Sequence, residues 1–236
     1  MAGKGKGGIW AIVPVKHLSV AKSRLAPVLG EARAPFMRLL ARRTVSLLTG
    51  SGLFAGVLVV TSDAAVAADA RAAGASTTFD WAADLNDACL AGIEHARAAG
   101  AEACMLVHAD LALLDQQSLA DVVSAFETRQ AAVAAPVAGL VRCKEGSGTT
   151  IAIFGSDAGF TPSFGANSFE RHMALPSVHP FEIASQAAAF DVDTPADLDL
   201  LAGIMPDLRL HQTADTEIWT YLELNDERDG AVDHAA

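Results

Sequence analysis

Short apolar runs alternate with longer segments of helical periodicity, and this alternation is the strongest constraint on the fold. Ile9–Val15 and Val57–Thr61 are rich in β-branched residues, and Met105–His108 is a third apolar run, which is typical of buried strands. Between residues 31 and 49, leucines and a phenylalanine recur at the spacing of one helix face, and Gly50 follows as a stop signal. The alternation predicts an α/β fold with a single three-layer α/β/α domain, in which helices cover both faces of a mostly parallel sheet.

The remaining segments continue this alternation. Ser62 or Asp63 is suited to cap a helix over 64–73, because a short oxygen-bearing side chain satisfies the first free N–H groups of a helix. We expect further strands at 76–79, 132–137, 149–154 and 190–192, and further helices at 86–99, from Ser118 to about 127, at 168–173 and at 195–202. Between 16 and 30 the sequence predicts a polar, basic loop.

Length and composition predict one folded domain with two flanking segments. The chain has 236 residues, of which 51% are hydrophobic and 19% charged, so a large core can be buried and disorder of the whole chain is excluded. We expect a flexible lead-in at 1–8, one folded domain at 9–205 and an acidic extension at 206–236. Residues 218–224 are apolar enough to pack as a strand or helix, on the same domain or on a second subunit of a homodimer, and we expect residues 225–236 to be disordered.

The sequence predicts a cytoplasmic protein without a membrane partner. Its longest uncharged apolar stretches, 52–60 and 131–141, are too short to span a bilayer. Cys89, Cys104 and Cys143 have no metal-ligand spacing, and an odd, small number of cysteines does not make a disulfide framework. We therefore expect buried thiols in a reducing compartment.

The net charge of −11 is unevenly distributed along the chain. Residues 1–50 contain nine Lys and Arg against one acid, whereas the rest of the chain is strongly acidic. A nucleic-acid partner needs a basic surface that displaces counterions, so the acidic balance excludes that class of partner. A basic start on an acidic body instead favours a local site for a small anion.

The loop after the first strand is the first candidate site. Lys16, Lys22 and Arg24 place three cations within nine residues, on a segment that leads into a helix. Compact positive charge and bidentate donors are what a polyphosphate requires. The alternative is a solvated basic loop. Neither a P-loop nor the dinucleotide-binding fingerprint is present, because the required glycines are missing.

Carboxylates in or directly after two predicted strands form the second and third candidate places. Asp110 comes directly after a buried strand, where it either holds Mg²⁺ beside phosphates or only starts a turn. Asp191 and Asp193 are two residues apart, so on an extended segment they point to the same side and repel one another unless a cation lies near them. Asp197 is assigned to the helix dipole and left out of the site. Together, the cations and carboxylates predict a metal–polyphosphate site beyond the carboxyl ends of the strands.

Several short motifs, in order, resemble one family. Val13–Lys16 and Ala21–Leu25 (V-P-V-K and A-K-S-R-L) resemble the opening motif of the CofC/FbiD family, the phospholactate or phosphoenolpyruvate guanylyltransferases of coenzyme F-420 biosynthesis. The resemblance continues through Leu85–Asn86, Ala109–Leu111, Gly146–Thr150, Phe164–Phe169 and Asp191–Pro195, and covers roughly residues 9–204. It implies a fold like that of the nucleotide-diphospho-sugar transferases.

The resemblance also implies a reaction and a set of site residues. A phosphate oxygen of a small phosphorylated acid would attack the α-phosphorus of GTP, pyrophosphate would leave, and Mg²⁺ would neutralise charge. The acceptor would be 2-phospho-L-lactate, phosphoenolpyruvate or 3-phosphoglycerate. By similarity, the triphosphate would be held by Lys16, Lys22 and Arg24 beside Pro14, and these three cations with Asp110 would be the catalytic residues. The metal would be bound by Asp110, Asp191 and Asp193, and the phosphorylated acid by Thr149, Gly165 and Ser168. The nucleoside would be contacted by Ser62, Asp63, Leu85 and Asn86.

The sequence departs from the family pattern at a few positions. His108 stands where the family often has Pro, and Lys144 stands in a loop where His or Asn is common. Arg142 or Lys144 therefore either binds the carboxylate of the acceptor or lies in an exposed loop. Two alternatives to the guanylyltransferase remain: another transferase of similar fold, acting on a molybdopterin, a sugar phosphate or a nucleotide-sugar, and a catalytically silent nucleotide-binding partner.

Overall fold

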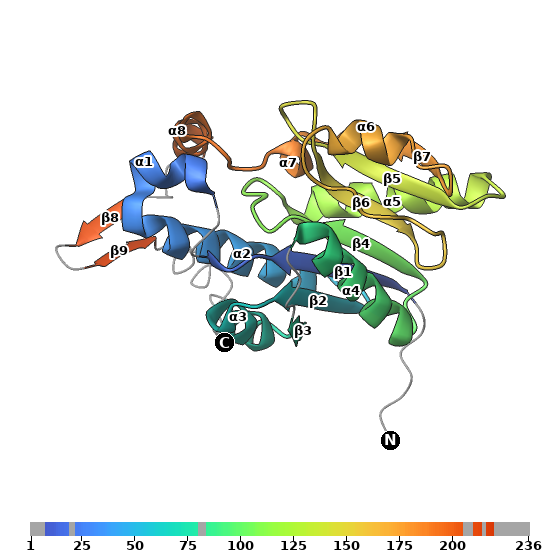
Figure 1. The fold of residues 1–236 in the computed structure, drawn as a ribbon, viewed down its shortest axis with the longest axis horizontal. Coiled ribbons are helices and arrows are strands. Elements are labelled where there is room, and N and C mark those ends of the chain that lie inside the picture. The colour runs from blue at the N-terminus through green and yellow to red at the C-terminus, as the bar shows by residue number, and fades with distance from the viewer. Residues whose placement is uncertain (1–7, 19–21, 80–83, 205–209, 214–215, 220–236) are drawn as a thin grey trace, which may run out of the picture.

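A seven-stranded sheet forms the centre of the molecule (Figure 1). The computed structural model describes residues 8–18, 22–79, 84–204, 210–213 and 216–219. The strands are β1 (Ile9–Val15), β2 (Gly56–Thr61), β3 (Ser76–Phe79), β4 (Ala103–Val107), β5 (Val137–Arg142), β6 (Thr149–Gly155) and β7 (His179–Glu182), in the spatial order β3-β2-β1-β4-β6-β5-β7. Only β6 runs antiparallel to its neighbours in this sheet. The predicted mostly parallel sheet is confirmed.

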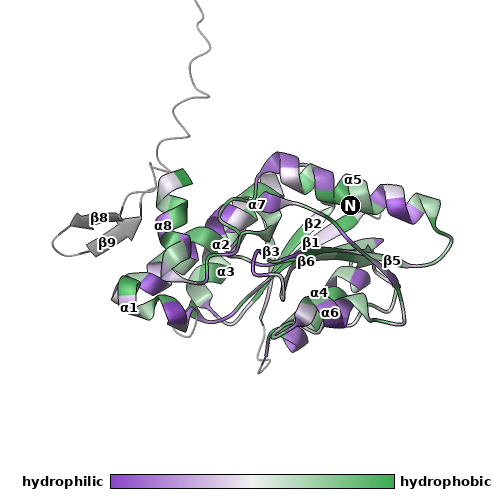
Figure 2. Ribbon diagram, turned by 90° about the horizontal axis from the view of Figure 1, so that it is seen from above, coloured by the Kyte–Doolittle hydropathy of each residue, from purple (hydrophilic) through white to green (hydrophobic). Residues whose placement is uncertain are grey.

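Helices cover both faces of the sheet (Figure 2). One face is covered by α2 (Arg33–Gly50), α3 (Ala64–Ala72), α5 (Gln116–Ala132), α7 (Gln186–Ala189) and α8 (Pro195–Ile204), and the other by α4 (Leu85–Ala98) and α6 (Ser168–Met173). A single turn, α1 (Ala26–Leu29), lies between two 3₁₀ segments in the basic region after β1. The three-layer architecture matches the expectation from the alternating pattern.

Alternate residues of each central strand pack into two separate hydrophobic clusters, one on each face of the sheet. In β1, Ala11 and Val13 pack beneath α2, whereas Ile12 packs beneath α4. In β4, Val107 belongs to the first cluster and Leu106 to the second, and both are fully buried. Because side chains alternate between the faces of a strand, a strand with helices on both sides needs apolar residues at every position, which explains the uninterrupted apolar runs.

The carboxyl ends of the parallel strands meet at one edge of the sheet. Residue pairing aligns Val15 of β1 with Thr61 of β2, and Ile12 of β1 with Leu106 of β4. Because β6 is antiparallel, its first residue, Thr149, also lies at this edge, near the end of β4. Loops from β1, β4, β6 and the segment before α8 therefore converge where such folds bind ligands.

Three of the predicted elements differ from the structure, two of them in their bounds and one in its type. The helix predicted from Ser118 begins at Gln116 and runs to Ala132, because Asp115 is the cap and Ser118 is the third helical residue of a capping box. The strand predicted at 132–137 is displaced to β5, since this helix extends to Ala132. The strand predicted at 190–192 is an extended segment without strand pairing, in which Val192 N donates to Asp110 O over 3.3 Å.

The flanking segments lie largely outside the described residues, so the domain boundaries at 8 and 205 stay predictions. Within the extension, β8 (Leu210–Thr213) and β9 (Thr216–Trp219) form a separate antiparallel pair. All three cysteines are buried free thiols, as expected. No helix in the described part of the chain is long and apolar enough to cross a membrane.

Candidate functional site

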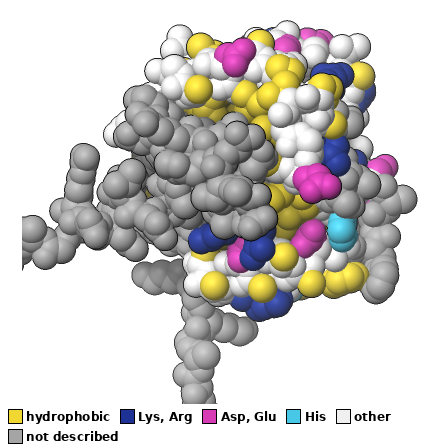
Figure 3. All heavy atoms as spheres, turned by 90° about the vertical axis from the view of Figure 1, so that its left-hand side faces the viewer, with side chains coloured by type: hydrophobic (Ala, Val, Ile, Leu, Met, Phe, Trp, Pro, Cys, Tyr) yellow, Lys and Arg dark blue, Asp and Glu magenta, His cyan; other side chains and the backbone are white. Residues whose placement is uncertain are grey.

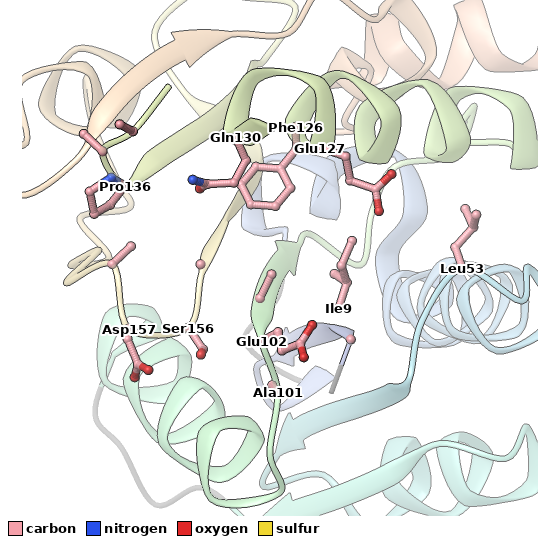
Figure 4. A pocket seen from close by; sticks show the side chains of 16 residues that line it. Ile9, Leu53, Ala101, Glu102, Phe126, Glu127, Gln130, Pro136, Ser156 and Asp157 are labelled. Carbon is pink, nitrogen blue, oxygen red and sulfur yellow. The ribbon is translucent and has the colours of Figure 1, made fainter. Parts of the chain in front are cut away.

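Two groups of cavities mark opposite edges of the sheet. A cavity of about 910 Å³ lies at the amino edge, and Figure 4 shows Glu102, Glu127 and Asp157 around it. None of the side chains singled out from the sequence lines it. At the carboxyl edge lie two adjoining hollows of about 530 and 270 Å³, and they contain most of the predicted site residues. Size therefore does not identify the site, and convergence of polar groups does.

Lys22 joins two of the three predicted metal ligands. Its ammonium group donates to a carboxylate oxygen of Asp193 and forms an ion pair with Asp110. Burial alone would lower the pKa of Lys22, but the two carboxylates outweigh it and raise the pKa well above its usual range. Its backbone is in the left-handed region, with φ of 49°, which is uncommon for a residue with a side chain. The structure thus holds this cation in a specific place.

Asp110 is buried and incompletely paired. Burial would raise the pKa of its carboxyl group, but the neighbouring Lys22 and His108 lower it, so the group is a carboxylate. Its Oδ1 atom is buried and has no hydrogen-bond partner among the described residues. A buried carboxylate oxygen without a partner is costly unless a cation binds it. The donor set at this position therefore fits a hard divalent cation.

Asp191 completes a cluster of three carboxylates, which we call the carboxylate cluster: Asp110, Asp191 and Asp193. Burial and the charge of Asp110 raise the pKa of Asp191 to about 6, against the opposing effect of Lys144. The chain therefore brings like charges together and leaves one of them difficult to ionise. In the described part of the chain, no three His, Cys, Asp or Glu side chains are arranged closely enough to hold a metal ion together, so metal binding by these three carboxylates stays a prediction.

Lys144 and Asp197 hold the segment that carries this cluster. Lys144 Nζ lies 3.3 Å from both Asp191 Oδ1 and Asp197 Oδ2. Asp197 Oδ2 accepts the backbone N–H groups of Asp193, over 2.8 Å, and of Thr194, over 2.7 Å. The assignment of Asp197 to the helix dipole alone is thus incomplete. The spacing T-x-x-D, a variant of the capping box, was the sequence signal that could have found this role.

Arg142 is the last residue of β5, whereas Lys144 is exposed in the loop between β5 and β6, and both contact protein side chains. Arg142 pairs with Glu182 and Glu170, and its guanidinium lies 3.7 Å from the centre of the Phe169 ring. Lys144 contacts the carboxylate-bearing segment and Glu145. Both cations contact protein groups, and binding of the carboxylate of the acceptor by either one stays a prediction.

The residues predicted to bind the acceptor form one wall of the larger hollow, together with Ser147 and Gly148, which we call the acceptor wall: Ser147, Gly148, Thr149, Gly165 and Ser168. Ser168 Oγ accepts the backbone N–H of Thr149 over 2.9 Å, and Thr149 Oγ1 lies 2.9 Å from Nδ1 of the buried His172. Gly165 has φ of 115°, a conformation that side chains rarely permit. Small side chains and fixed polar atoms make this wall suitable for a compact anion.

Some of the residues predicted to bind the triphosphate or to face the nucleoside line the two hollows, and others do not. Pro14, Lys16 and Leu85 line the smaller hollow, and Arg24 lines the larger one. The remaining three, Ser62, Asp63 and Asn86, line neither of these hollows. For these three residues, contact with a nucleoside stays a prediction.

Two of these residues instead hold loops in place. Asp63 caps α3 through Ala65 N and Val66 N, and it accepts Leu18 N over 3.3 Å, which anchors the segment that follows Lys16. Burial would raise the pKa of Asp63, and these backbone hydrogen bonds lower it. The amide of Asn86 makes a reciprocal pair with the backbone of Phe164, at 2.6 and 3.3 Å.

Charged side chains of both signs lie on the face of the molecule shown in Figure 3. On the face shown in Figure 3, the Lys and Arg side chains of the described residues lie among acidic ones and form no continuous basic surface.

The fold and the polar groups at its carboxyl edge define a nucleotidyltransferase, and the comparisons with known proteins identify its family. The model of the MobA-like NTP transferase domain matches residues 35–201. The chain belongs to this family. It is 32% identical over 200 residues to the phosphoenolpyruvate guanylyltransferase of Sphaerobacter thermophilus, covering 83% of this chain and 93% of that protein. It is 36% identical over 194 residues to the protein of the same name from Rubrobacter xylanophilus, covering 80% and 91%.

Solved structures confirm the fold. A putative nucleotide-diphospho-sugar transferase from Desulfovibrio desulfuricans aligns with a TM-score of 0.60 at 16% identity, over 84% of this chain and 88% of that one. A CMP:2-keto-3-deoxy-manno-octonic acid synthetase complexed with CTP aligns with a TM-score of 0.54 at 15% identity, over 85% and 99%. The predicted similarity to nucleotide-diphospho-sugar transferases is therefore confirmed at the level of the fold.

Proposed function

We propose that this protein transfers GMP from GTP to a small phosphorylated three-carbon acid, with release of pyrophosphate and with Mg²⁺ bound. Phosphoenolpyruvate, the acceptor in the names of the relatives, is the first acceptor to test, with 2-phospho-L-lactate and 3-phosphoglycerate beside it. The proposal places the reaction in the cytoplasm and in coenzyme F-420 biosynthesis, as the family resemblance implies.

The observation that carries this proposal is the meeting of the carboxylate cluster with Lys22 beside the acceptor wall. The two hollows share Lys22, Asp191 and Asp193, so a ligand in either one reaches the same charged groups. One hollow continues to Lys16 and Pro14, and the other continues to Thr149 and Ser168. Two anionic substrates can therefore approach one another across a shared set of charges, as a group transfer between phosphates requires.

Asp110, Asp191 and Asp193 would hold Mg²⁺ in this account. The unpartnered Oδ1 of Asp110 and the mutual repulsion around Asp191 support a cation here, beside the charges that Lys22 and Lys144 already supply. When bound, Mg²⁺ neutralises phosphate charge and stabilises the charge that develops on the leaving pyrophosphate.

The chain's own residues then bind and orient the reactants. Lys22, with Lys16 and Arg24, would bind the triphosphate, and the acceptor wall would hold the phosphorylated acid. A phosphate oxygen of the acid forms a bond to the α-phosphorus, and the bond from the α-phosphorus to the oxygen that bridges it to the β-phosphorus breaks. The phosphate nucleophile is already anionic at neutral pH, so no protein base has to remove a proton. Positioning and charge stabilisation carry the catalysis.

A thermal-shift panel tests the choice of substrates. GTP, ATP, CTP and UTP are each added with Mg²⁺, alone and with each of the three acids. Because a ligand that binds only the folded state raises stability, GTP with the preferred acid should raise the melting temperature most. A larger shift with another nucleotide, or with GTP and a molybdopterin or a sugar phosphate, would overturn the proposal in favour of another nucleotidyltransferase. A shift with GTP but no pyrophosphate release would indicate a silent nucleotide-binding partner.

A further inference from the structure

His108 is the polar residue of the site for which no role has been given. It follows β4 directly, two residues before Asp110. The imidazole lines both hollows at the carboxyl edge, a property it shares with Lys22, Leu85, Asp191 and Asp193. It therefore lies at the junction of the region of the triphosphate and the region of the acceptor.

The imidazole is held in place by the fold. The backbone N–H of His108 donates to Thr150 O over 3.1 Å, which continues the β4–β6 pairing beyond the strand. The ring centre lies 5.0 Å from that of Phe164, at an interplanar angle of 47°. The backbone of Phe164 is in turn fixed by Asn86. A ring fixed on a strand end and against an aromatic side chain is pre-organised for a contact.

The Nε2 atom of His108 is buried, and no described residue forms a hydrogen bond with it. A buried ring nitrogen without a partner costs free energy, and an apolar side chain would avoid that cost. A fold that keeps such an atom beside a ligand-sized hollow suggests that a ligand supplies the partner. The second buried side-chain atom without a partner at this site is Oδ1 of Asp110, which belongs to the proposed cation site.

We infer that His108 is a specificity-determining residue that binds an oxyanion of the acceptor through Nε2. The inference rests on the proposed function. His108 lines the smaller hollow with Lys22 and Asp110, and the larger hollow with Lys22, Gly165 and Ser168. An oxygen of the phosphorylated acid placed there is close both to the charged cluster and to the acceptor wall. A nitrogen donor at this position orients the acid relative to the α-phosphorus.

The test compares His108→Leu with His108→Gln in steady-state assays of pyrophosphate release. His108→Leu removes the nitrogen, and KM for the acceptor should rise about 10- to 100-fold while KM for GTP stays within about twofold. His108→Gln keeps a nitrogen donor at a similar reach and should recover most of the loss. The melting temperature of His108→Leu should equal or exceed that of the wild type, because an unsatisfied buried polar atom has been removed.

The outcomes separate this inference from the proposed function. If the wild type transfers GMP and His108→Leu has an unchanged KM for the acceptor, the inference is overturned. A rise in the KM values for GTP and acceptor together, or a lower melting temperature in both variants, would show a packing role and would also overturn it. If the wild type releases no pyrophosphate with any of the acids, the proposed function itself fails.

Discussion

The ammonium group of Lys22 donates a hydrogen bond to the carboxylate of Asp193, which lies 171 residues further along the chain. The same group pairs with Asp110 at the end of β4. One lysine thus joins the loop after the first strand, the loop after β4 and the segment before the last helix of the sheet domain. It also pairs with carboxylate oxygens that we propose as metal ligands. A bound metal ion should therefore restore stability that is lost when the lysine is removed.

Replacing Lys22 by Met should expose this compensation. Without the ammonium group, Asp110 stays buried and unpaired, and the loss of one partner of a buried ion pair costs about 3–5 kcal/mol. We expect a lower melting temperature in metal-free buffer, a recovery on addition of Mg²⁺ that is larger than in the wild type, and loss of turnover. Lys16→Met, at an exposed lysine of the same region, is the control and should melt like the wild type. Equal melting of Lys22→Met and wild type in metal-free buffer would refute this relationship.

Binding of Mg²⁺ should depend on pH through Asp191. Burial and the charge of Asp110 raise the pKa of this group to about 6, so its carboxylate form is depleted below that pH. We expect Mg²⁺ affinity, measured by calorimetry, to rise through pH 6 by up to about tenfold per unit and then to level off. Asp191→Asn should bind Mg²⁺ weakly and without this slope. An affinity in the wild type that is constant from pH 5 to 7 would contradict the assignment.

The raised pKa of Asp191 also affects the stability of the metal-free protein, which should fall as the pH rises, whereas the affinity for Mg²⁺ should increase. Between its ordinary pKa of 3.8 and the folded value of about 6, Asp191 holds a proton that the unfolded chain has released. Its contribution to stability is therefore present at low pH and is lost as the pH rises through 6. In urea denaturation in metal-free buffer, the free energy of unfolding of the wild type should fall relative to that of Asp191→Asn as the pH rises through 6.

Asp197 should act on the site through the backbone. Its carboxylate accepts the N–H groups of Asp193 and Thr194, so Asp197→Ala removes a helix cap and frees the segment that carries two metal ligands. We expect a loss of about 1–2 kcal/mol in urea denaturation, together with weaker Mg²⁺ binding. Asp197→Asn keeps an oxygen acceptor and should retain most of both. If Asp197→Ala loses stability but binds Mg²⁺ unchanged, Asp197 only caps the helix.

The sequence predicted most of the strands and helices and the groups that converge on the site, because these depend on local patterns. It did not predict β7 or α7. Apolar runs without alternation indicated buried strands, and Asp110, Asp191 and Lys22 were found from charge at strand ends. The partners of Lys144 and Arg142 could not be predicted, since they depend on how the loop between β5 and β6 meets the segments around Asp191 and Glu182. The antiparallel direction of β6 also depends on pairing between distant segments, which no local pattern specifies.

The acceptor wall should loosen at acid pH because of His172. Ser163 N donates to Nε2 of this ring over 2.9 Å, so Nε2 is an acceptor and the ring is neutral. Burial, with the charges of Arg171 and His108, lowers the pKa of His172 from 6.5 to about 4. The unfolded chain therefore binds a proton at higher pH than the folded protein does, and stability should fall as pH decreases from 6.5 to 4, by on the order of 2 kcal/mol.

Urea denaturation at a series of pH values measures this effect. His172→Asn should reduce the slope between pH 4 and 6.5, whereas His95→Asn, at an exposed histidine of α4, should retain it. If the slope persists in His172→Asn, the loss of stability comes from another group.

Phosphorus NMR of a reaction mixture tests the central claim most directly. Wild-type protein is incubated with GTP, Mg²⁺ and phosphoenolpyruvate, with 2-phospho-L-lactate and with 3-phosphoglycerate, and Asp193→Ala is incubated in parallel. The account predicts that pyrophosphate and a phosphoanhydride joining GMP to the acid appear in equal amounts, only when GTP and an acid are both present, and not with the folded Asp193→Ala variant. Unchanged GTP with all three acids, or an active Asp193→Ala variant, would contradict it.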